Sequence, residues 1–318
     1  MRVAAVVVTY NRLDHLRRTV ARLLEEGVDH LLVVDNGSDD GSRDWLAVQD
    51  DPRLAVLLAA ANGGGAQGFE DGLRAAVARF DPDWCVLMDD DARPRPGALA
   101  AFRARGHGRA DAVAAAVTHP DGRICEMNRP WRNPFWHGRA FLGALGGGRG
   151  GFHVPDAALA PGADPLPVDG ASFVGLFLSR AAVRRAGYPE GGLFIYGDDV
   201  LYTLALSRAG GRIVLDPAVA WEHDCTLADP GAVFRPLWKT YYLHRNRWFV
   251  YRAAAGPLLF WPLMAAMAWR WSRAGRRLPP EEGAVFRRLS RLALRDAARG
   301  RRHRPHAEIV ALAAARTG

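Results

Sequence analysis

Four short runs, apolar throughout except for His30 at the start of the second, alternate with helix-like segments in the first 90 residues of this 318-residue chain. A strand that is apolar at every position has both faces buried, so its sheet needs helices on both sides. Strands of this kind alternating with helices indicate a parallel sheet of the α/β class. The expected strands are residues 3–8, 30–34, 54–59 and 84–88, and the expected helices are residues 14–26, 42–48 and 67–80.

Each of these expected strands ends in a cluster of polar residues. The clusters are Thr9–Arg12, Asp35–Asp40, Asn62–Gly68 and Asp89–Asp91. The carboxyl ends of parallel strands meet at one edge of the sheet, and open α/β sheets bind their ligands there. The sequence therefore predicts a ligand site at this edge.

Three consecutive aspartates, Asp89–Asp91, follow the fourth expected strand. Like charges at close range repel one another, and burial disfavours the ionised form further. A divalent cation removes both problems, and carboxylate oxygens suit Mg²⁺ or Mn²⁺, which usually also bind substrate phosphates. We expect Asp89 and Asp91 to face the cation and Asp90 to point elsewhere or to contact the bound substrate. A solvated acidic turn is the alternative.

Two further polar groups lie in the second half of the chain. Asp198 and Asp199 open an expected helix, where carboxylates are favoured, and one of them is a candidate general base. Simple capping of the helix by Asp198 is the alternative. His223 follows an expected strand at residues 212–215 and is a candidate metal ligand. Cys225 does not make this a zinc site, because the sequence offers no second pair of soft ligands nearby.

The charge of the chain is unevenly distributed. Residues 226–318 carry 18 Lys and Arg against 5 Asp and Glu, a net charge of +13, whereas residues 1–225 have a net charge of −5. We expect this basic, aromatic-rich tail to be helical and to have an anionic partner. Its segment 256–271 either lies in a membrane interface, with arginines on anionic headgroups, or packs on the body as an ordinary helical bundle. Nucleic acid is not an expected partner.

Other features limit the location of the protein. Three widely spaced cysteines argue for a reducing compartment without structural disulfides. The apolar N-terminal run lacks a cleavage site and is expected to be a buried strand. No stretch of 18 apolar residues is free of charge or proline, so a membrane-spanning helix is not expected. Residues 130–170 are irregular and rich in Gly, Pro and Trp, and the part from Trp131 to Gly151 is expected to help select a substrate.

Five segments together resemble the inverting family 2 glycosyltransferases, which have the GT-A fold. They are VVVTYNR at 6–12, VVDNGSDDGS at 33–42, NGGGAQGF at 62–69, MDDDARP at 88–94 and FIYGDDVLYTLALSRAGGRIVLDPAVAWEHD at 194–224. Their order and spacing are more specific than any segment alone. NGGGAQGF, and GDD with a later His, are most similar to the galactofuranosyl- and rhamnosyltransferases of cell-wall assembly. The family often has Glu-Asp or Trp-Asp-Asp where this chain has Gly197-Asp198-Asp199, so the choice of base between the two acids stays open.

The resemblance covers roughly residues 1–225 and implies a mostly parallel GT-A sheet flanked by helices there. Residues 226–318 lie outside it, and their sequence predicts a C-terminal helical region. It implies inverting transfer of a sugar, of galactofuranose or rhamnose type, from a UDP- or dTDP-linked donor. The acceptor would be a hydroxyl of a glycan or a lipid-linked glycan in cell-wall or surface polysaccharide assembly. The protein would be cytoplasmic or peripheral on the inner face of the cell membrane.

The resemblance also implies roles for individual residues. Asp199 would be the base and Asp198 a sugar or acceptor contact, while Asp89, Asp91 and His223 would bind Mn²⁺ or Mg²⁺. Asp35 would accept the N3–H of uracil or thymine. The other implied donor contacts are Thr9, Tyr10, Arg12, Asn62, Gly63, Gly64, Gln67 and Asp90. The expected acceptor platforms are Trp131, Trp136 and Trp221.

Three other functions fit parts of the sequence. A nucleotidyltransferase can use a similar sheet, but its first turn is usually glycine-rich and basic, unlike Thr9-Tyr10-Asn11. A dinucleotide-dependent oxidoreductase could be built on Gly63–Gly68, which satisfies G-x-G-x-x-G, although Asp89–Asp91 would repel a pyrophosphate. A non-catalytic module that binds nucleotide sugars would keep the donor site and need no base.

Overall fold

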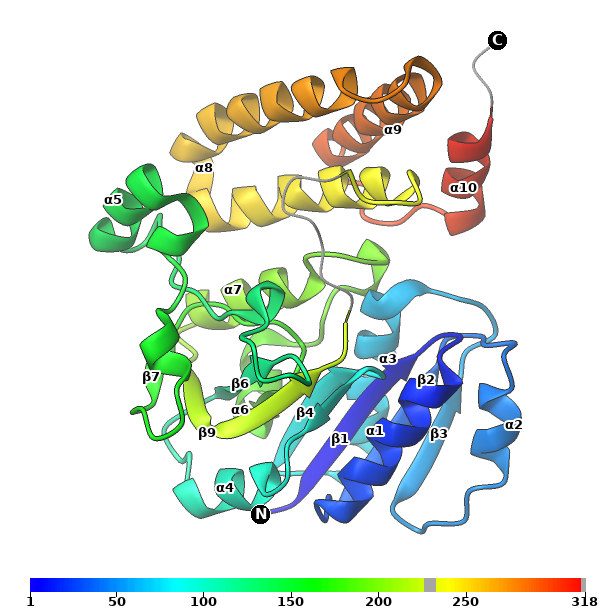
Figure 1. Cartoon of the computed structure of the whole chain (residues 1–318), viewed down its shortest axis with the longest axis vertical. Helices are drawn as coiled ribbons and strands as arrows, with labels where there is room; N and C mark the ends of the chain where they lie inside the picture. The colour runs from blue at the N-terminus through cyan, green and yellow to red at the C-terminus, as the bar shows by residue number, and fades with distance from the viewer. Residues whose placement is uncertain (226–232, 316–318) are drawn as a thin grey trace.

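The apolar runs form one continuous sheet in the computed structural model, which describes residues 1–225 and 233–315 (Figure 1). The strand order in this part of the chain is β3-β2-β1-β4-β8-β6-β9-β5, with β7 paired to β9. The strands are β1 (Val3–Thr9), β2 (His30–Asp35), β3 (Leu54–Leu58), β4 (Trp84–Asp89), β5 (Ala92–Pro94), β6 (Ala112–Thr118), β7 (Leu166–Val168), β8 (Leu176–Ser179) and β9 (Ile213–His223). The predicted α/β class is confirmed.

The first four expected strands are parallel to one another, as predicted. β1 pairs in parallel with both β2 and β4, and β2 pairs in parallel with β3. The register places Thr9 opposite Asp35 and Val8 opposite Asp89. The polar clusters that end these strands therefore lie at one edge of the sheet.

The other half of the sheet is mixed. β8 is antiparallel to β4 and β6, β6 is parallel to β9, and β9 is antiparallel to β5 and β7. β9 also continues to His223, beyond the end expected at residue 215, because buried and half-buried residues alternate from Val219 to His223 as in a strand. β5, β6 and the helix between them were not predicted.

The helices cover both faces of the sheet. Val6 and Val8 pack in one core with α3, whereas Val3, Ala5 and Val7 pack in the other with α1. Glycines let α3 approach the sheet closely, since a Cβ at Gly68 would lie 2.5 Å from Val8 Cγ1. The helices are α1 (Leu13–Glu25), α2 (Ser42–Ala47), α3 (Gly64–Phe80), α4 (Ala98–Arg105), α5 (Gly138–Gly147), α6 (Arg180–Ala186), α7 (Asp198–Arg208), α8 (Lys239–Arg276), α9 (Pro280–Ala298) and α10 (His306–Ala314).

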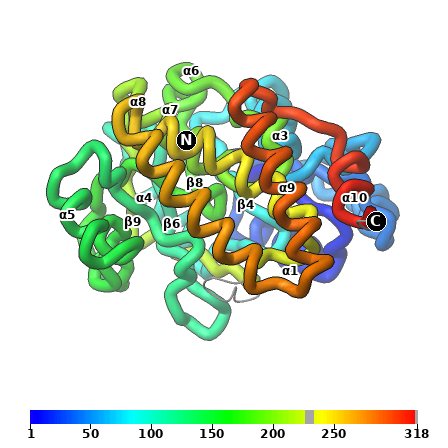
Figure 2. Tube along the Cα trace, turned by 90° about the horizontal axis from the view of Figure 1, so that it is seen from above, coloured from blue at the N-terminus to red at the C-terminus, as the bar shows by residue number. Residues whose placement is uncertain are grey.

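The C-terminal helices form a layer over the carboxyl edge of the sheet (Figures 1 and 2). Gly256, with φ +69°, breaks α8 into two arms, and Figure 1 shows the second arm running back over the first. The first arm packs on the body, where Tyr241 and Tyr242 share a core with Phe194. The boundary expected at residue 225 adjoins residues 226–232, which lie outside the described residues, and we retain the two-part division as a proposal.

One helix among the described residues, α8, is long and apolar enough to cross a membrane by length and composition alone. The sequence analysis did not expect such a helix, because charges and prolines interrupt its apolar stretches. Pro257 and Pro262 lie within it, and Phe260, Met264 and Trp271 pack against Phe286 of α9. These features make the helix weak evidence for a membrane span.

Candidate active site

Asp89, Asp91 and His223 come together at the carboxyl edge of the sheet. Asp89 ends β4, Asp91 follows in the turn to β5, and His223 ends β9. The pairing of β5 with β9 places Ala92 opposite His223, and this brings the imidazole beside the acidic turn. One ligand atom from each side chain lies within 4.8 Å of the others, and His223 Nε2 is 3.1 Å from Asp91 Oδ1. The three side chains can hold one metal ion.

Asn128, which the sequence analysis missed, orients the imidazole of His223. The amide oxygen of Asn128 lies 2.7 Å from His223 Nδ1, while its amide nitrogen donates to Ser172 Oγ at 2.8 Å. Because an amide oxygen can only accept, Nδ1 carries the hydrogen and Nε2 faces Asp91. Metal-binding histidines are commonly fixed by such an outer partner. No sequence signal marks Asn128, since it ends a three-residue 3-10 helix (Glu126–Asn128) and lies 95 residues before His223.

The acidic turn is only partly neutralised by the protein. Burial raises the pKa of Asp89 to about 7, and the charge of Asp91 adds to the shift. Burial opposes ionisation of Asp91 as well, but His223 and Arg12 outweigh it and lower the pKa of that carboxyl group. Burial raises the pKa of Asp90 to about 6. The unmatched negative charge at Asp89 suits a divalent cation.

Thr9 and Asp90 bind each other instead of presenting their side chains to a ligand. Thr9 Oγ1 donates to Asp90 Oδ2 at 2.7 Å, and both residues are almost fully buried. These side chains support the acidic turn, and their expected contacts with the donor remain a prediction. Arg12 pairs with Asp91, whereas the side chain of Tyr10 is exposed beside the edge.

Asp35 has one satisfied and one unsatisfied carboxylate oxygen. Its Oδ2 accepts from the backbone nitrogens of Gly37 and Ser38 at 3.1 Å and from Arg43 Nε at 2.7 Å. Its Oδ1 is buried and has no hydrogen-bond partner among the described residues. A buried polar atom without a partner is unfavourable, so this oxygen is suited to a donor group on a ligand.

The glycine-rich segment makes room for another part of the protein. A Cβ at Gly64 would lie 2.1 Å from the carbonyl oxygen of Phe194, and the side chain of Gln67 packs against Gly191. Asn62 Oδ1 accepts from the backbone nitrogen of Gly64 at 2.8 Å. Gly63, Gly64 and Gln67 thus pack against the 191–194 turn and the first turn of α3, and their expected contacts with a donor remain a prediction.

Asp198 and Asp199 begin α7 after a strained turn. Phe194 and Tyr196 have φ values of +67° and +71°. Residues other than glycine rarely adopt this backbone region, and such residues often mark functional sites. Burial raises the pKa of Asp198 to about 8, with further contributions from Asp199 and Asp89. Burial also raises the pKa of Asp199, to about 6. Both shifts are upward, and Asp199 is the more acidic of the two carboxyl groups.

Asn246 in α8 holds this turn in place. Its amide nitrogen lies within 3.0 Å of three backbone carbonyl oxygens, those of Leu193, Ile195 and Tyr196. The neighbouring Arg245 donates to Leu193 O at 2.8 Å. The sequence analysis missed both residues because it assigned them to a tail with a separate role. The first arm of α8 is thus part of the support of the acidic pair.

The three expected acceptor tryptophans lie in different environments. Trp221 is fully buried against Phe177 and beneath Gly175, so it cannot stack on a sugar, and this expectation is wrong. The expectation failed because β9 continues past residue 215, where it was expected to end, and places Trp221 on the buried face of the strand. Trp131 and Trp136 are half-buried in the loop that precedes β7, and both remain candidates.

Comparisons with known proteins find similar sequences and folds. The model of the glycosyl transferase family 2 matches residues 4–157. The chain is 28% identical over 279 residues to galactofuranosyltransferase GlfT1 of Mycolicibacterium smegmatis, an alignment that covers 86% of this chain and 88% of the relative. It is 26% identical over 264 residues to the GlfT1 protein of Mycobacterium tuberculosis, covering 78% and 81% respectively.

Solved structures resemble the fold at low sequence identity. S. aureus TarS 1–349 in complex with UDP-GlcNAc has a TM-score of 0.58 at 14% identity, covering 98% of this chain and 84% of that one. The mannosyltransferase PcManGT from Pyrobaculum calidifontis, in complex with GDP-Man and Mn²⁺, has a TM-score of 0.50 at 18% identity, covering 98% and 78%. These structures are GT-A glycosyltransferases, as the sequence resemblance implied.

Proposed function

We propose that this chain, a glycosyltransferase with a family 2 domain, transfers a galactofuranosyl residue from UDP-galactofuranose to a hydroxyl of a lipid-linked glycan in cell-wall assembly. The observation that carries the proposal is the grouping of Asp89, Asp91 and His223 at the same sheet edge as Asp35. Similarity to the two GlfT1 proteins over most of their length supports galactofuranose over rhamnose.

The unpaired oxygen of Asp35 would recognise the base of the donor. Uracil carries an N3–H donor between two carbonyl groups, and a buried carboxylate oxygen without a partner accepts such a hydrogen bond. Thymine offers the same N3–H, and guanine offers an N1–H, so this contact alone does not distinguish UDP-, dTDP- and GDP-linked sugars. It does not select the sugar.

Asp89, Asp91 and His223 would hold a divalent cation against the diphosphate. A bound Mn²⁺ or Mg²⁺ supplies positive charge to the departing diphosphate. Mg²⁺ prefers oxygen ligands, whereas imidazole suits transition metals better, so the presence of His223 favours Mn²⁺. The two carboxylates alone would serve either ion.

Asp199 would accept the proton of the acceptor hydroxyl as the new glycosidic bond forms. Its pKa of about 6 keeps it ionised near neutral pH, as a general base requires. Asp198, with a pKa of about 8, would remain protonated and donate a hydrogen bond to a sugar or to the acceptor. One base and one stabilised leaving group suffice for a single displacement that inverts the anomeric carbon.

A donor screen tests the proposed specificity. We expect kcat/KM for UDP-galactofuranose to exceed that for dTDP-rhamnose and the common UDP-pyranoses by at least about 100-fold, because sites that bind sugar hydroxyls reject poorly matched sugars strongly. Transfer to a synthetic lipid-linked glycan, with and without Mn²⁺, is the measurement. Equal or better use of dTDP-rhamnose would replace the proposed donor.

We further propose that the second arm of α8 binds a membrane surface peripherally. Leu258 is 88% exposed, and Trp261 and Trp269 are 63% and 60% exposed, on a helix whose other face packs against α9. Arg273 lies over the ring of Trp269 at 4.9 Å, next to further exposed arginines. Aromatic residues and arginines together suit the headgroup layer of an anionic membrane.

Vesicle sedimentation tests this surface. We expect the protein to sediment with vesicles that contain an anionic lipid, and binding to fall at least about tenfold between 50 and 500 mM salt, because headgroup attraction is screened. The double variant Trp261→Ala and Trp269→Ala should bind more weakly, whereas Val48→Ala, at an exposed apolar site on the body, should bind normally. Absence of binding at every salt concentration would refute the proposal.

A further inference from the structure

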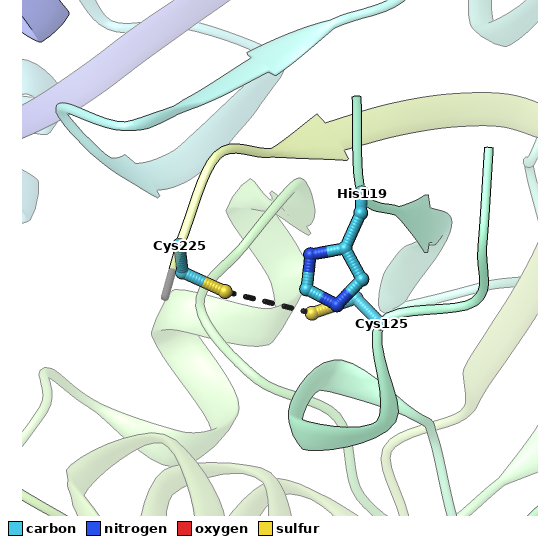
Figure 3. A group of neighbouring side chains, drawn as sticks. All are labelled: His119, Cys125 and Cys225. Carbon is cyan, nitrogen blue, oxygen red and sulfur yellow. Dashed lines mark hydrogen bonds between the residues drawn. The ribbon is translucent and has the colours of Figure 1, made fainter. Parts of the chain in front are cut away.

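Three soft or borderline metal ligands gather beside the acidic site: His119, Cys125 and Cys225 (Figure 3). His119 directly follows β6, and a tight turn brings the chain back so that Cys125 N donates to Val117 O at 3.1 Å. Cys225 lies two residues beyond β9, the parallel neighbour of β6. The fold thus supplies the partners that the sequence did not show for Cys225.

The distances within this cluster suit a tetrahedral metal ion. Cys125 Sγ and Cys225 Sγ are 3.9 Å apart, and the ligand atoms of all three residues lie within 4.8 Å of one another. Two thiolates on one Zn²⁺, each at about 2.3 Å, lie about 3.8 Å apart at a tetrahedral angle, whereas the sulfurs of a disulfide are separated by about 2.0 Å. We propose that His119, Cys125 and Cys225 bind a thiophilic divalent cation of the Zn²⁺ class.

The surroundings of the cluster leave room for a fourth ligand. The thioether sulfur of Met127 lies 3.8 Å from Cys225 Sγ, and the side chain of Met127 is 51% exposed. A water molecule or this thioether completes the tetrahedron, and the exposed side provides a path for the ion to enter. His119 and Cys125 are buried, which shields the other side of the site.

This site is distinct from the acidic one in its chemistry but adjoins it. Two thiolates and an imidazole select a soft or borderline ion, whereas the carboxylates of Asp89 and Asp91 select a harder one. Asn128 connects the two groups, because its Oδ1 accepts from Cys125 Sγ at 3.0 Å and from His223 Nδ1 at 2.7 Å. A metal ion on Cys125 would take the place of the thiol proton and so remove the hydrogen bond to Asn128, which couples the two sites through Asn128. The proposal does not depend on which sugar is transferred.

Reconstitution of the full-length protein tests the site. Metal is first removed with a chelator under reducing conditions, and Zn²⁺ or Co²⁺ is then added. We expect one equivalent of the added Zn²⁺ to remain bound after desalting, and added Co²⁺ to give a thiolate-to-metal charge-transfer band. Cys125→Ser and Cys225→Ser should each remove the band and lower Zn²⁺ affinity by at least about tenfold, since each deletes a ligand. Cys85→Ala, at the buried cysteine in β4, and Asp89→Asn should both retain the band.

X-ray absorption of the Zn²⁺-loaded wild-type protein gives a test that does not depend on the folding of variants. We expect two sulfur ligands at about 2.3 Å and additional nitrogen or oxygen ligands at about 2.0–2.1 Å. A coordination shell without sulfur would overturn the proposal. So would a failure of the reduced protein to retain Zn²⁺, or a charge-transfer band that persists when both Cys125 and Cys225 are replaced by serine.

Discussion

Replacing Asp199 with asparagine is expected to lower kcat by about 10²- to 10⁴-fold, the range for loss of a general base. The change removes the carboxylate that would accept the acceptor proton, but it preserves the shape of the side chain. Donor affinity should change by less than about threefold, because Asp35 and the acidic turn at Asp89–Asp91 are untouched. Transfer rates and calorimetric titration with UDP measure the two effects separately. If the protein were a non-catalytic binding module, the wild type itself would show no transfer activity.

The neighbouring acid provides the matched control. Burial raises the pKa of Asp198 to about 8, above that of Asp199, and Asp198→Asn would keep a neutral hydrogen-bond donor in its place. We expect this variant to lose less than about tenfold in kcat. The wild-type rate should fall as the pH drops through about 6, where Asp199 becomes protonated, and Asp199→Asn should lack this limb of the profile. If Asp198→Asn were the more damaged variant, the base would be Asp198.

The sequence predicted the part of the site that local patterns determine. The apolar runs at 3–8 and 84–88 became β1 and β4 within one residue at their ends, and their parallel pairing carried Asp89 to the same edge as Asp35. A strand that is apolar throughout leaves few alternatives, because it must be covered on both faces. The placement of His223 beside Asp89 and Asp91 rested on the family resemblance, and the structure places the three together.

The sequence could not predict contacts that depend on distant segments. Asn246 lies about 50 residues from the carbonyl oxygens that it binds, and Asn128 lies 95 residues from His223. Neither residue stands in a periodic pattern, since each acts through a single side-chain amide. Trp221 was misjudged for a related reason: β9 was expected to end at residue 215, so the inward direction of this side chain in the longer strand could not be inferred.

Replacing Asp89 with asparagine is expected to weaken Mn²⁺ binding by at least about 100-fold, more than the 10- to 100-fold that follows loss of an outer-shell partner. Asparagine offers a neutral oxygen where the ion is proposed to meet a carboxylate. Transfer activity should fall by a similar factor at limiting Mn²⁺, because the departing diphosphate would lose its counter-charge. Calorimetric titration with Mn²⁺ and initial rates over a range of Mn²⁺ concentrations are the measurements.

The choice of Asp89 over Asp91 makes this result interpretable. Asp91 balances Arg12 and His223, so neutralising it would leave buried positive charge without a partner and could unfold the protein. Asp89 has a pKa raised to about 7 because burial and Asp91 disfavour its charged form, and above that pH Asp89→Asn removes an unfavourable charge from the metal-free protein. Its Tm without metal should equal or exceed that of the wild type, and Mn²⁺ should raise only the wild-type value.

Asp90→Asn is the matched control, because its side-chain oxygen can still accept from Thr9. It should keep Mn²⁺ affinity within about threefold of the wild type, since Asp90 lies outside the proposed ligand set. Equal losses in Asp90→Asn and Asp89→Asn would contradict the proposed ligand set, since general electrostatic attraction of the cation would then explain both.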